Sequence, residues 1–362
     1  MLFAAALYVA RVHDAMPGFD AYHAAATRVL QGDSPYRAGT TGPFTYMPVM
    51  AIAMTPLALF EHAAARFIWF TVSVGLLTVF VRWAVHGLPE RRRSEDALQW
   101  PTLALMLPFY AHELTAGQAN VLLGVLLMGS LMAVQVDLPR AGGILLGAAI
   151  FIKPYALLLL PWLAFAHGAR AVVATSMVLA AGLIVPALLF GWTGNIDMLV
   201  AWFRTVSDSP LDGARLLESV SIGAMWMKWL GPSRLTIFLT ILSTAAILGL
   251  VTTVWVQRRT IFDPNYLECA LIMLLIPLLS SRGAEYVLLL ATPAVVCLLD
   301  RWGETSTRWR AFTCVALVAM SLAGMDVFGA GFRTFVTASG AVTVAGLGLV
   351  VALAHLRWKA LA

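Results

Sequence analysis

The stretch from Gly18 to Tyr36, GFDAYHAAATRVLQGDSPY, concentrates ionisable side chains in a chain that is otherwise strongly apolar. Asp20 and His23 are three residues apart, a spacing that puts two side chains on the same face of a helix. A carboxylate placed in this way can act as a general base on a hydroxyl. Asp is also a favoured N-cap residue, so Asp20 could instead open a helix over residues 20–31, closed by Gly32. Both interpretations are open on these residues alone.

Two cations further along the chain have the chemistry to hold a phosphate. Lys153 lies in the middle of an apolar segment, where a charge is costly and usually marks a functional site or a partner. A snorkelling or paired structural lysine explains it equally well. Arg282 lies in SSRGAE, between two apolar segments, and its planar guanidinium can donate two bonds to one phosphate. The alternative for that segment is a solvated loop.

Other polar and aromatic side chains are candidates for lining a substrate site. The amides of Gln118 and Asn120, in AGQAN, precede an apolar segment and can cap a helix or hydrogen-bond sugar hydroxyls. The remaining expected lining residues are Tyr22, His23, Tyr46, Glu285 and Tyr286.

The composition of the chain indicates the elements that must position these residues. Of the 362 residues, 60% are hydrophobic and 12% are charged, whereas soluble domains average about 25% charged residues. Apolar stretches of about 20 residues recur along the chain, and this is the length that a helix needs to cross a bilayer. We therefore expect an all-α polytopic membrane protein that forms a single integral membrane domain over residues 1–362. The net charge is only +5, and the sequence has no basic stripe suited to binding nucleic acid.

Twelve apolar segments are expected to lie in the membrane. The Lys153-Pro154 pair should divide one of them into two short legs, 142–153 and 154–166, because proline disrupts a helix and restricts the residue before it. Segment 46–60 is short, carries two prolines and is expected to be re-entrant. The segments are 1–12, 46–60, 65–86, 97–113, 118–136, 142–166, 171–191, 234–256, 266–280, 284–300, 311–329 and 334–354.

Clusters of arginine and lysine favour one orientation. RRR at 91–93, RR at 258–259 and RWK at 357–359 fall on the same side, which is expected to be cytoplasmic. The opposite side then holds a first outer loop, 13–45, with its short interfacial helix, and a second large outer loop, 192–233. Within the second loop, NIDMLVAWFRT at 195–205 is typical of an amphipathic helix at the membrane interface.

The sequence lacks the usual signatures of nucleotide and metal chemistry. It contains no P-loop and no dinucleotide glycine fingerprint, so a phosphate-bearing substrate is expected to arrive through the lipid. The three cysteines lie in apolar segments and have no metal-ligand spacing.

Four motifs in order resemble a known family. They are GFDAYHAAATRVLQGDSPY with FTYMPVMAIAMTPLA, then GQANVLLGVLL, then AGGILLGAAIFIKPYALLLLPWL, then PLLSSRGAEYVLLLATP. Over roughly residues 18–300 the chain is similar to glycosyltransferase family 87, the polyprenyl-phosphate-mannose-dependent α-mannosyltransferases of the GT-C superfamily. The family's proline, tryptophan and histidine are absent from SSRGAEYV, so a histidine role there is not carried over. Tyr286 or Glu285 would take that place.

The resemblance implies a GT-C-type fold with about 10–13 membrane segments and an active site at the outer face of a bacterial-type plasma membrane, facing the periplasm or the cell exterior. It implies sugar transfer, most often of mannose, from a polyprenyl-phosphate donor to a glycan or glycolipid acceptor. Asp20 would be the general base of an inverting displacement, with Lys153 and Arg282 holding the donor phosphate. No cofactor and no divalent metal are expected. The alternatives are a transporter or flippase of a lipid-linked saccharide, and a non-catalytic scaffold.

Overall fold

Helices dominate the structure of the protein, which is a computed structural model describing residues 2–37, 43–207, 213–260, 264–280, 283–323 and 329–359. Within these ranges the regular elements are α-helices and short 3-10 or π segments, and Ser219 and Ala284 form an isolated antiparallel bridge. The predicted all-α class is therefore confirmed. The chain divides into two compact units, Met1–Phe80 with Ala111–Pro210 and Val81–Tyr110 with Leu211–Ala362.

Long apolar helices identify the protein as integral to a membrane. Among the described residues, four helices are long and apolar enough to cross a bilayer. They are α5 (His62–His86), α10 (Ala169–Ser207), α13 (Arg234–Val256) and α18 (Ala341–Lys359). The described residues also contain shorter apolar helices of 10–17 residues. Short apolar segments were expected from the sequence as well.

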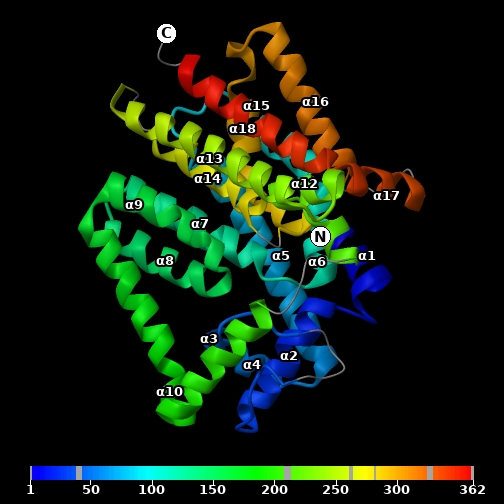
Figure 1. The fold of residues 1–362 in the computed structure, drawn as a ribbon, viewed down its shortest axis with the longest axis vertical. Helices are drawn as coiled ribbons and strands as arrows, with labels where there is room; N and C mark the ends of the chain where they lie inside the picture. The colour runs from blue at the N-terminus through cyan, green and yellow to red at the C-terminus, as the bar shows by residue number, and fades with distance from the viewer. Residues whose placement is uncertain are drawn as a thin grey trace. The chain divides into compact units, whose positions relative to one another are not determined.

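The first unit holds most of the residues singled out from the sequence. Its helix α8 packs against both α7 and α10 (Figure 1). A Cβ at Gly143 would come within 2.2 Å of the Ala171 carbonyl oxygen, so glycine permits this close helix approach. Besides α10 and part of α5, the elements are α1 (Leu2–Leu7), η1 (Tyr8–Val12), α2 (Pro17–Leu30), α3 (Pro48–Ala53), α4 (Thr55–Ala58), the end of α6 (Glu95–Ala116), α7 (Asn120–Gln135), α8 (Pro139–Ile152), η2 (Pro154–Leu158) and α9 (Leu159–His167).

Two expectations about this unit can be compared with the elements. The predicted break in segment 142–166 is confirmed, because α8 ends at Ile152 and Lys153 has an extended backbone before η2. The predicted helix over residues 20–31 begins earlier than expected, at Pro17. Proline suits the first helical position because its missing N–H would have no partner there and its φ is already helical.

Helix α10 bends sharply at Gly191, where φ is +70° and ψ is 172°. The part that follows, residues 192–207, contains the predicted amphipathic helix. One side of it is held inward, since the indole Nε1 of Trp202 donates to the carbonyl oxygen of Thr45 at 3.1 Å. Another face carries exposed apolar residues at helical spacing, namely Trp192, Ile196, Val200 and Phe203.

The second unit places α12 against α13 and α16 against α18 (Figure 1). The expected segment 334–354 is not one helix: α17 ends at Ser339, and Gly340, with φ +69°, separates it from α18. Segment 284–300 likewise begins as a 3-10 helix before α15. The elements not yet given are α11 (Gly213–Glu218), α12 (Ile222–Leu230), η3 (Gln257–Thr260), α14 (Asn265–Leu279), η4 (Glu285–Ala291), α15 (Thr292–Asp300), η5 (Trp302–Glu304), α16 (Thr307–Ala323) and α17 (Gly329–Ser339).

Candidate active site

The carboxylate of Asp20 contacts side chains of α5 and the backbone just before α2. It lies in the first turn of α2, and its side chain is 20% exposed. Oδ1 is 3.2 Å from Nη2 of Arg66 and 3.2 Å from Nε2 of His62, both in α5. Oδ2 accepts the backbone N–H of Met16 at 3.3 Å. Asp20 is thus not the N-cap residue, which is Met16, but it bonds to the backbone of that residue.

The guanidinium of Arg66 organises this cluster. Arg66 is buried, and its Nη1 donates to the carbonyl oxygen of His13 at 2.6 Å. Its Nη2 lies between Asp20 and Nδ1 of His62, 3.2 Å from each. His62 and Arg66 are four residues apart in α5, so both side chains leave the same helix face toward Asp20. Arg66 and the backbone of Met16 thus fix the two oxygens of Asp20 from different sides of the cluster.

His23 sits beside this cluster and not in it. Its ring makes an edge contact with His62, with ring centroids 4.9 Å apart, and a tilted contact with Phe19 at 5.8 Å. Burial lowers the pKa of His23, opposed by its hydrogen bond to the backbone of Phe60 and by the charge of Asp20. The lowered pKa makes the neutral form of the His23 ring the main one at physiological pH. A lining role for His23 stays a prediction.

Three side chains expected to line the site meet in one polar network. The hydroxyls of Tyr22 and Tyr46 are 2.7 Å apart, and each lies 3.1 Å from Oε1 of Gln118. Both tyrosines are buried. The hydroxyl of Tyr36 also donates to the Tyr46 carbonyl at 2.6 Å, which ties the end of the opening stretch to the same point.

Glycines allow α2 to approach the turn between α6 and α7. A Cβ at Gly18 would lie 2.5 Å from Nε2 of Gln118, and one at Gly117 would lie 2.5 Å from Cγ of Met16. Gly117 also has φ +68°, a left-handed conformation that glycine adopts without strain. Its carbonyl accepts the indole N–H of Trp69 at 3.0 Å.

Glu113 has a structural role that the sequence motifs did not predict. This residue is 1% exposed, and its carboxylate accepts the backbone N–H groups of Asn120 at 2.6 Å and Val121 at 3.2 Å, together with the side-chain amide of Asn120 at 2.7 Å. It therefore caps the N-terminus of α7, a role expected of the amides in AGQAN. The available signal was a carboxylate at the end of an apolar segment, seven residues before Asn120.

Lys153 lies at the break between α8 and η2, as expected from Pro154. It is half-buried, and its charge and that of Glu113 attract each other. Lys153 therefore has an acidic neighbour within its own unit, as the paired-lysine alternative requires. Arg282 lies outside the described residues, so the expected pairing of the two cations around a phosphate is not described.

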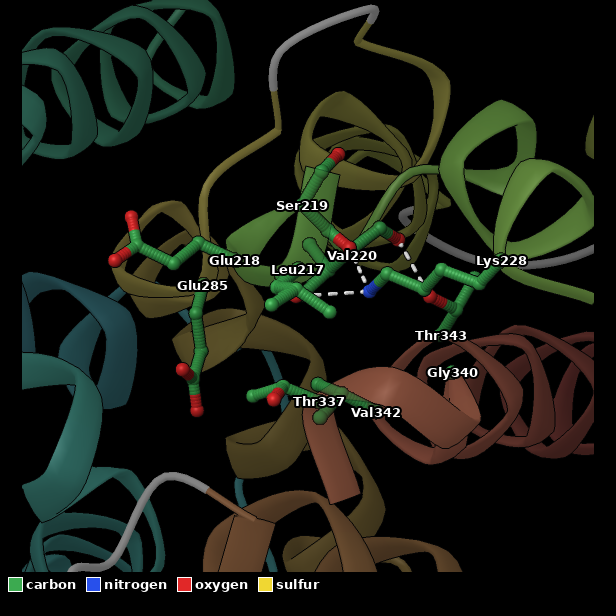
Figure 2. A pocket seen from close by; sticks show the side chains of 10 residues that line it. All are labelled: Leu217, Glu218, Ser219, Val220, Lys228, Glu285, Thr337, Gly340, Val342 and Thr343. Carbon is green, nitrogen blue, oxygen red and sulfur yellow. Dashed lines mark hydrogen bonds between the residues drawn. The ribbon is translucent and has the colours of Figure 1, made fainter. Parts of the chain in front are cut away.

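Glu285 and Tyr286 belong to the second unit, in η4. Glu285 is 2% exposed and lines a small pocket with Lys228 of α12 (Figure 2). The Nζ of Lys228 donates to the carbonyl oxygens of Leu217 at 2.9 Å and Ser219 at 2.8 Å. Burial lowers the pKa of Lys228 to about 8, opposed by the charge of Glu285. The pocket encloses about 10 Å³, which is room for one water molecule and not for a sugar.

The cluster around Asp20 is the part of the described structure best suited to base chemistry. Its Oδ1 accepts from the buried Arg66, and the side chain stays partly exposed in the first turn of α2. Among the described residues, no group of three or more His, Cys, Asp or Glu side chains is placed to hold a metal ion.

The sequence also matches a known protein family. The model of glycosyltransferase family 87 matches residues 44–281, which is more than half of the chain. The chain belongs to glycosyltransferase family 87. Together with the apolar helices, this makes the protein a membrane-embedded glycosyltransferase and confirms the resemblance seen in the sequence. The family 87 match begins after Asp20 and ends before Arg282, so it does not test the roles of these two residues.

Two individual proteins are also similar to this family 87 chain. GPI mannosyltransferase 1 of Aspergillus fumigatus is 31% identical over 137 residues, which are 36% of this chain and 31% of that protein. The chain thus matches less than a third of this curated relative. The crystal structure of ArnT from Cupriavidus metallidurans in the apo state aligns with 98% of this chain and 76% of that one. Its TM-score is 0.38 at 16% identity, which does not establish a shared fold.

Proposed function

We propose that this family 87 member transfers mannose from a polyprenyl-phosphate donor to a glycan or glycolipid acceptor, in a GT-C-type arrangement at the outer face of a bacterial-type plasma membrane. The observation that carries the proposal is the Asp20 carboxylate, which Arg66 and His62 contact on one oxygen while the side chain stays partly exposed. The name of the partial relative in Aspergillus fumigatus supports mannose as the sugar.

The proposed chemistry is a single displacement with inversion. The acceptor hydroxyl attacks C1 of the sugar, its proton passes to Asp20, and the bond between C1 and the phosphate oxygen breaks. Polyprenyl phosphate leaves with the electron pair. A phosphate leaving group needs cations more than a strong acid, and Lys153 and Arg282 are proposed for that role.

We expect the transfer to need no divalent metal. Oδ1 of Asp20 already accepts from Arg66, and the guanidinium 3.2 Å away repels a second cation. Retained turnover after chelation with EDTA would support this, and restoration of lost turnover by added Mg²⁺ or Mn²⁺ would contradict it.

Transfer is tested with the purified protein in nanodiscs, polyprenyl-phosphate sugars and membrane glycolipids, with intact-mass analysis of products. Asp20→Asn should reduce kcat by about 100-fold or more, since a general base contributes about 10²–10⁴. Asp14→Asn is the matched control, because that side chain is 95% exposed. Wild-type rates in Asp20→Asn would refute the base assignment. No transfer by the wild type, together with movement of labelled lipid-linked saccharide across vesicles, would favour a transporter.

A further inference from the structure

We propose that a groove in the second unit binds an anionic phospholipid, with the headgroup at Arg93 and an acyl chain along the apolar lining. The groove has a volume of about 190 Å³. Arg93, just before α6, is its one charged lining residue. The other lining residues come from α6, α15, η5 and α16 of the same unit, and they are Leu105, Leu299, Trp302, Cys314, Leu317 and Val318. None of them takes part in the proposed transfer step.

The guanidinium of Arg93 is available to an external anion. In the same RRR segment, Arg91 pairs with Glu95 at 3.0 Å and Arg92 pairs with Glu304. Arg93 is exposed, and it forms no ion pair within the ranges that the structure describes. Its planar fork can therefore donate to two oxygens of one phosphate group.

The backbone of Arg93 is held in place although its side chain is exposed. Oδ1 of Asp300, a buried carboxylate at the end of α15, accepts the N–H groups of Arg92 at 2.9 Å and of Arg93 at 3.0 Å. Trp302, two residues after Asp300, lines the groove. The cation and the groove are thus anchored to one another before a ligand arrives, which reduces the entropic cost of binding.

The charges in the segments next to the groove favour a headgroup with net negative charge. Residues 82–96 and 300–310 together contain seven arginines and five carboxylates. A zwitterionic headgroup brings its own cation, which this excess of arginine repels. RRR at 91–93 falls on the side expected to be cytoplasmic, and the cytoplasmic leaflet is the one that carries anionic lipids.

The apolar lining has the length of one acyl chain. Leu105 lies ten residues after the start of α6 at Glu95, and Val318 lies eleven residues after the start of α16 at Thr307. At about 1.5 Å per residue both are about 15 Å along their helices, which is half of a hydrocarbon layer of about 30 Å. A cavity of about 150 Å³ already accepts benzene, so this groove has room for part of a chain. Val315 beside it is 68% exposed, so lipid can reach α16 from the side.

Native mass spectrometry of the full-length protein in dodecyl maltoside measures the binding. The delipidated protein is titrated with dioleoyl-phosphatidylglycerol and, separately, with dioleoyl-phosphatidylcholine. Wild type should bind one phosphatidylglycerol with a Kd about tenfold lower than that for phosphatidylcholine. Arg93→Gln should raise the Kd for phosphatidylglycerol about tenfold, the effect of losing a hydrogen bond to a charged group, and Arg93→Lys should restore it in part. Arg308→Gln is the matched control, because Arg308 is exposed in the same unit and does not line the groove.

Cys314 reports whether the lipid lies in the groove. It is exposed, whereas Cys269 and Cys297 are buried. Bound phosphatidylglycerol should slow the reaction of Cys314 with N-ethylmaleimide about threefold or more in wild type and have no such effect in Arg93→Gln. Cys314→Trp should fill the groove and raise the Kd for phosphatidylglycerol, with the unfolding temperature unchanged.

The opposite results would overturn the proposal. Equal Kd values for the two lipids in wild type, or an unchanged Kd in Arg93→Gln, would show that Arg93 holds no anionic headgroup. Unprotected Cys314 in the lipid-bound protein would place the lipid elsewhere. Tighter binding of undecaprenyl phosphate than of phosphatidylglycerol would assign the groove to a carrier lipid instead. None of these measurements involves sugar transfer, so a failure here leaves the proposed function standing.

Discussion

The carboxylate of Glu113 accepts both the backbone N–H and the side-chain amide of Asn120, at 2.6 Å and 2.7 Å, while both residues are buried. Glu113 thereby holds the start of α7, two residues after Gln118, which contacts Tyr22 and Tyr46. Glu113 therefore supports the polar network formed by Tyr22, Tyr46 and Gln118.

Removal of the Glu113 carboxylate should destabilise the protein. Glu113→Ala leaves the buried N–H groups at the start of α7 without their acceptor, which should cost about 2–4 kcal/mol. Thermal unfolding in detergent measures this, with Glu61→Gln as the control at an exposed glutamate. An unchanged unfolding temperature in Glu113→Ala would show that water satisfies these groups instead.

Lys153 can be tested for phosphate binding against its pairing with Glu113. If Lys153 holds the donor phosphate, Lys153→Gln should raise KM for the polyprenyl-phosphate sugar about tenfold, since hydrogen bonds to charged groups contribute about 1.5–3 kcal/mol. Steady-state kinetics at several donor concentrations measures the change. A lower unfolding temperature with an unaltered KM would instead assign Lys153 a structural role only.

Alanine at Gly117 should disturb the contact between α2 and the turn before α7. Its φ of +68° costs a residue with a Cβ about 1–2 kcal/mol, and the new atom would lie 2.5 Å from Met16. Gly32→Ala isolates the backbone cost, because Gly32 has φ +79° and nothing within 4 Å. Gly117→Ala should therefore lose more stability than Gly32→Ala and lose transfer activity as well. Equal losses in the two variants would exclude a packing contribution.

His23 should make stability depend on pH in mildly acidic solution. Burial lowers its pKa below the ordinary value of 6.5, so between these two pKa values the unfolded state binds more protons than the folded state. The free energy of unfolding should then increase as pH rises toward 6.5 and should show no further contribution from His23 above it. Thermal unfolding between pH 5 and 7.5 should show this slope, and His23→Gln should reduce it. An identical slope in the variant would assign it to another group.

Features that depend on local sequence could be predicted. The apolar segments gave the all-α membrane class, and Lys153-Pro154 gave the break between α8 and η2, because proline acts on its immediate neighbours. Asp20 stood out since it was a carboxylate near a helix start. The sequence predicted that Tyr22, Tyr46 and Gln118 line one site, but it did not predict the hydrogen bonds between them.

Features that depend on contacts between distant segments could not be predicted. His62 and Arg66 lie over forty positions beyond Asp20, in the first turns of the long apolar helix α5, and only the packing of α2 against that helix brings them to Asp20. The role of Glu113 likewise depends on a fold-back of the chain, because its carboxylate caps the helix that begins at Asn120. Helix α2 starts three residues before the predicted position, because Pro17 fits the first helical position and Met16, not Asp20, is the N-cap.

The part of α10 that follows the bend at Gly191 has apolar side chains exposed on one face and a hydrogen bond to another segment of the chain on a second face. Beyond the bend, Trp192, Ile196, Val200 and Phe203 are open to whatever surrounds the protein, while Trp202 holds the backbone of Thr45. The next residue, Tyr46, belongs to the tyrosine network. We expect lateral pressure on the exposed side to reach Thr45 through this hydrogen bond. Turnover measured in a detergent micelle should differ from turnover in a bilayer for this reason, and Trp202→Phe should make the two alike.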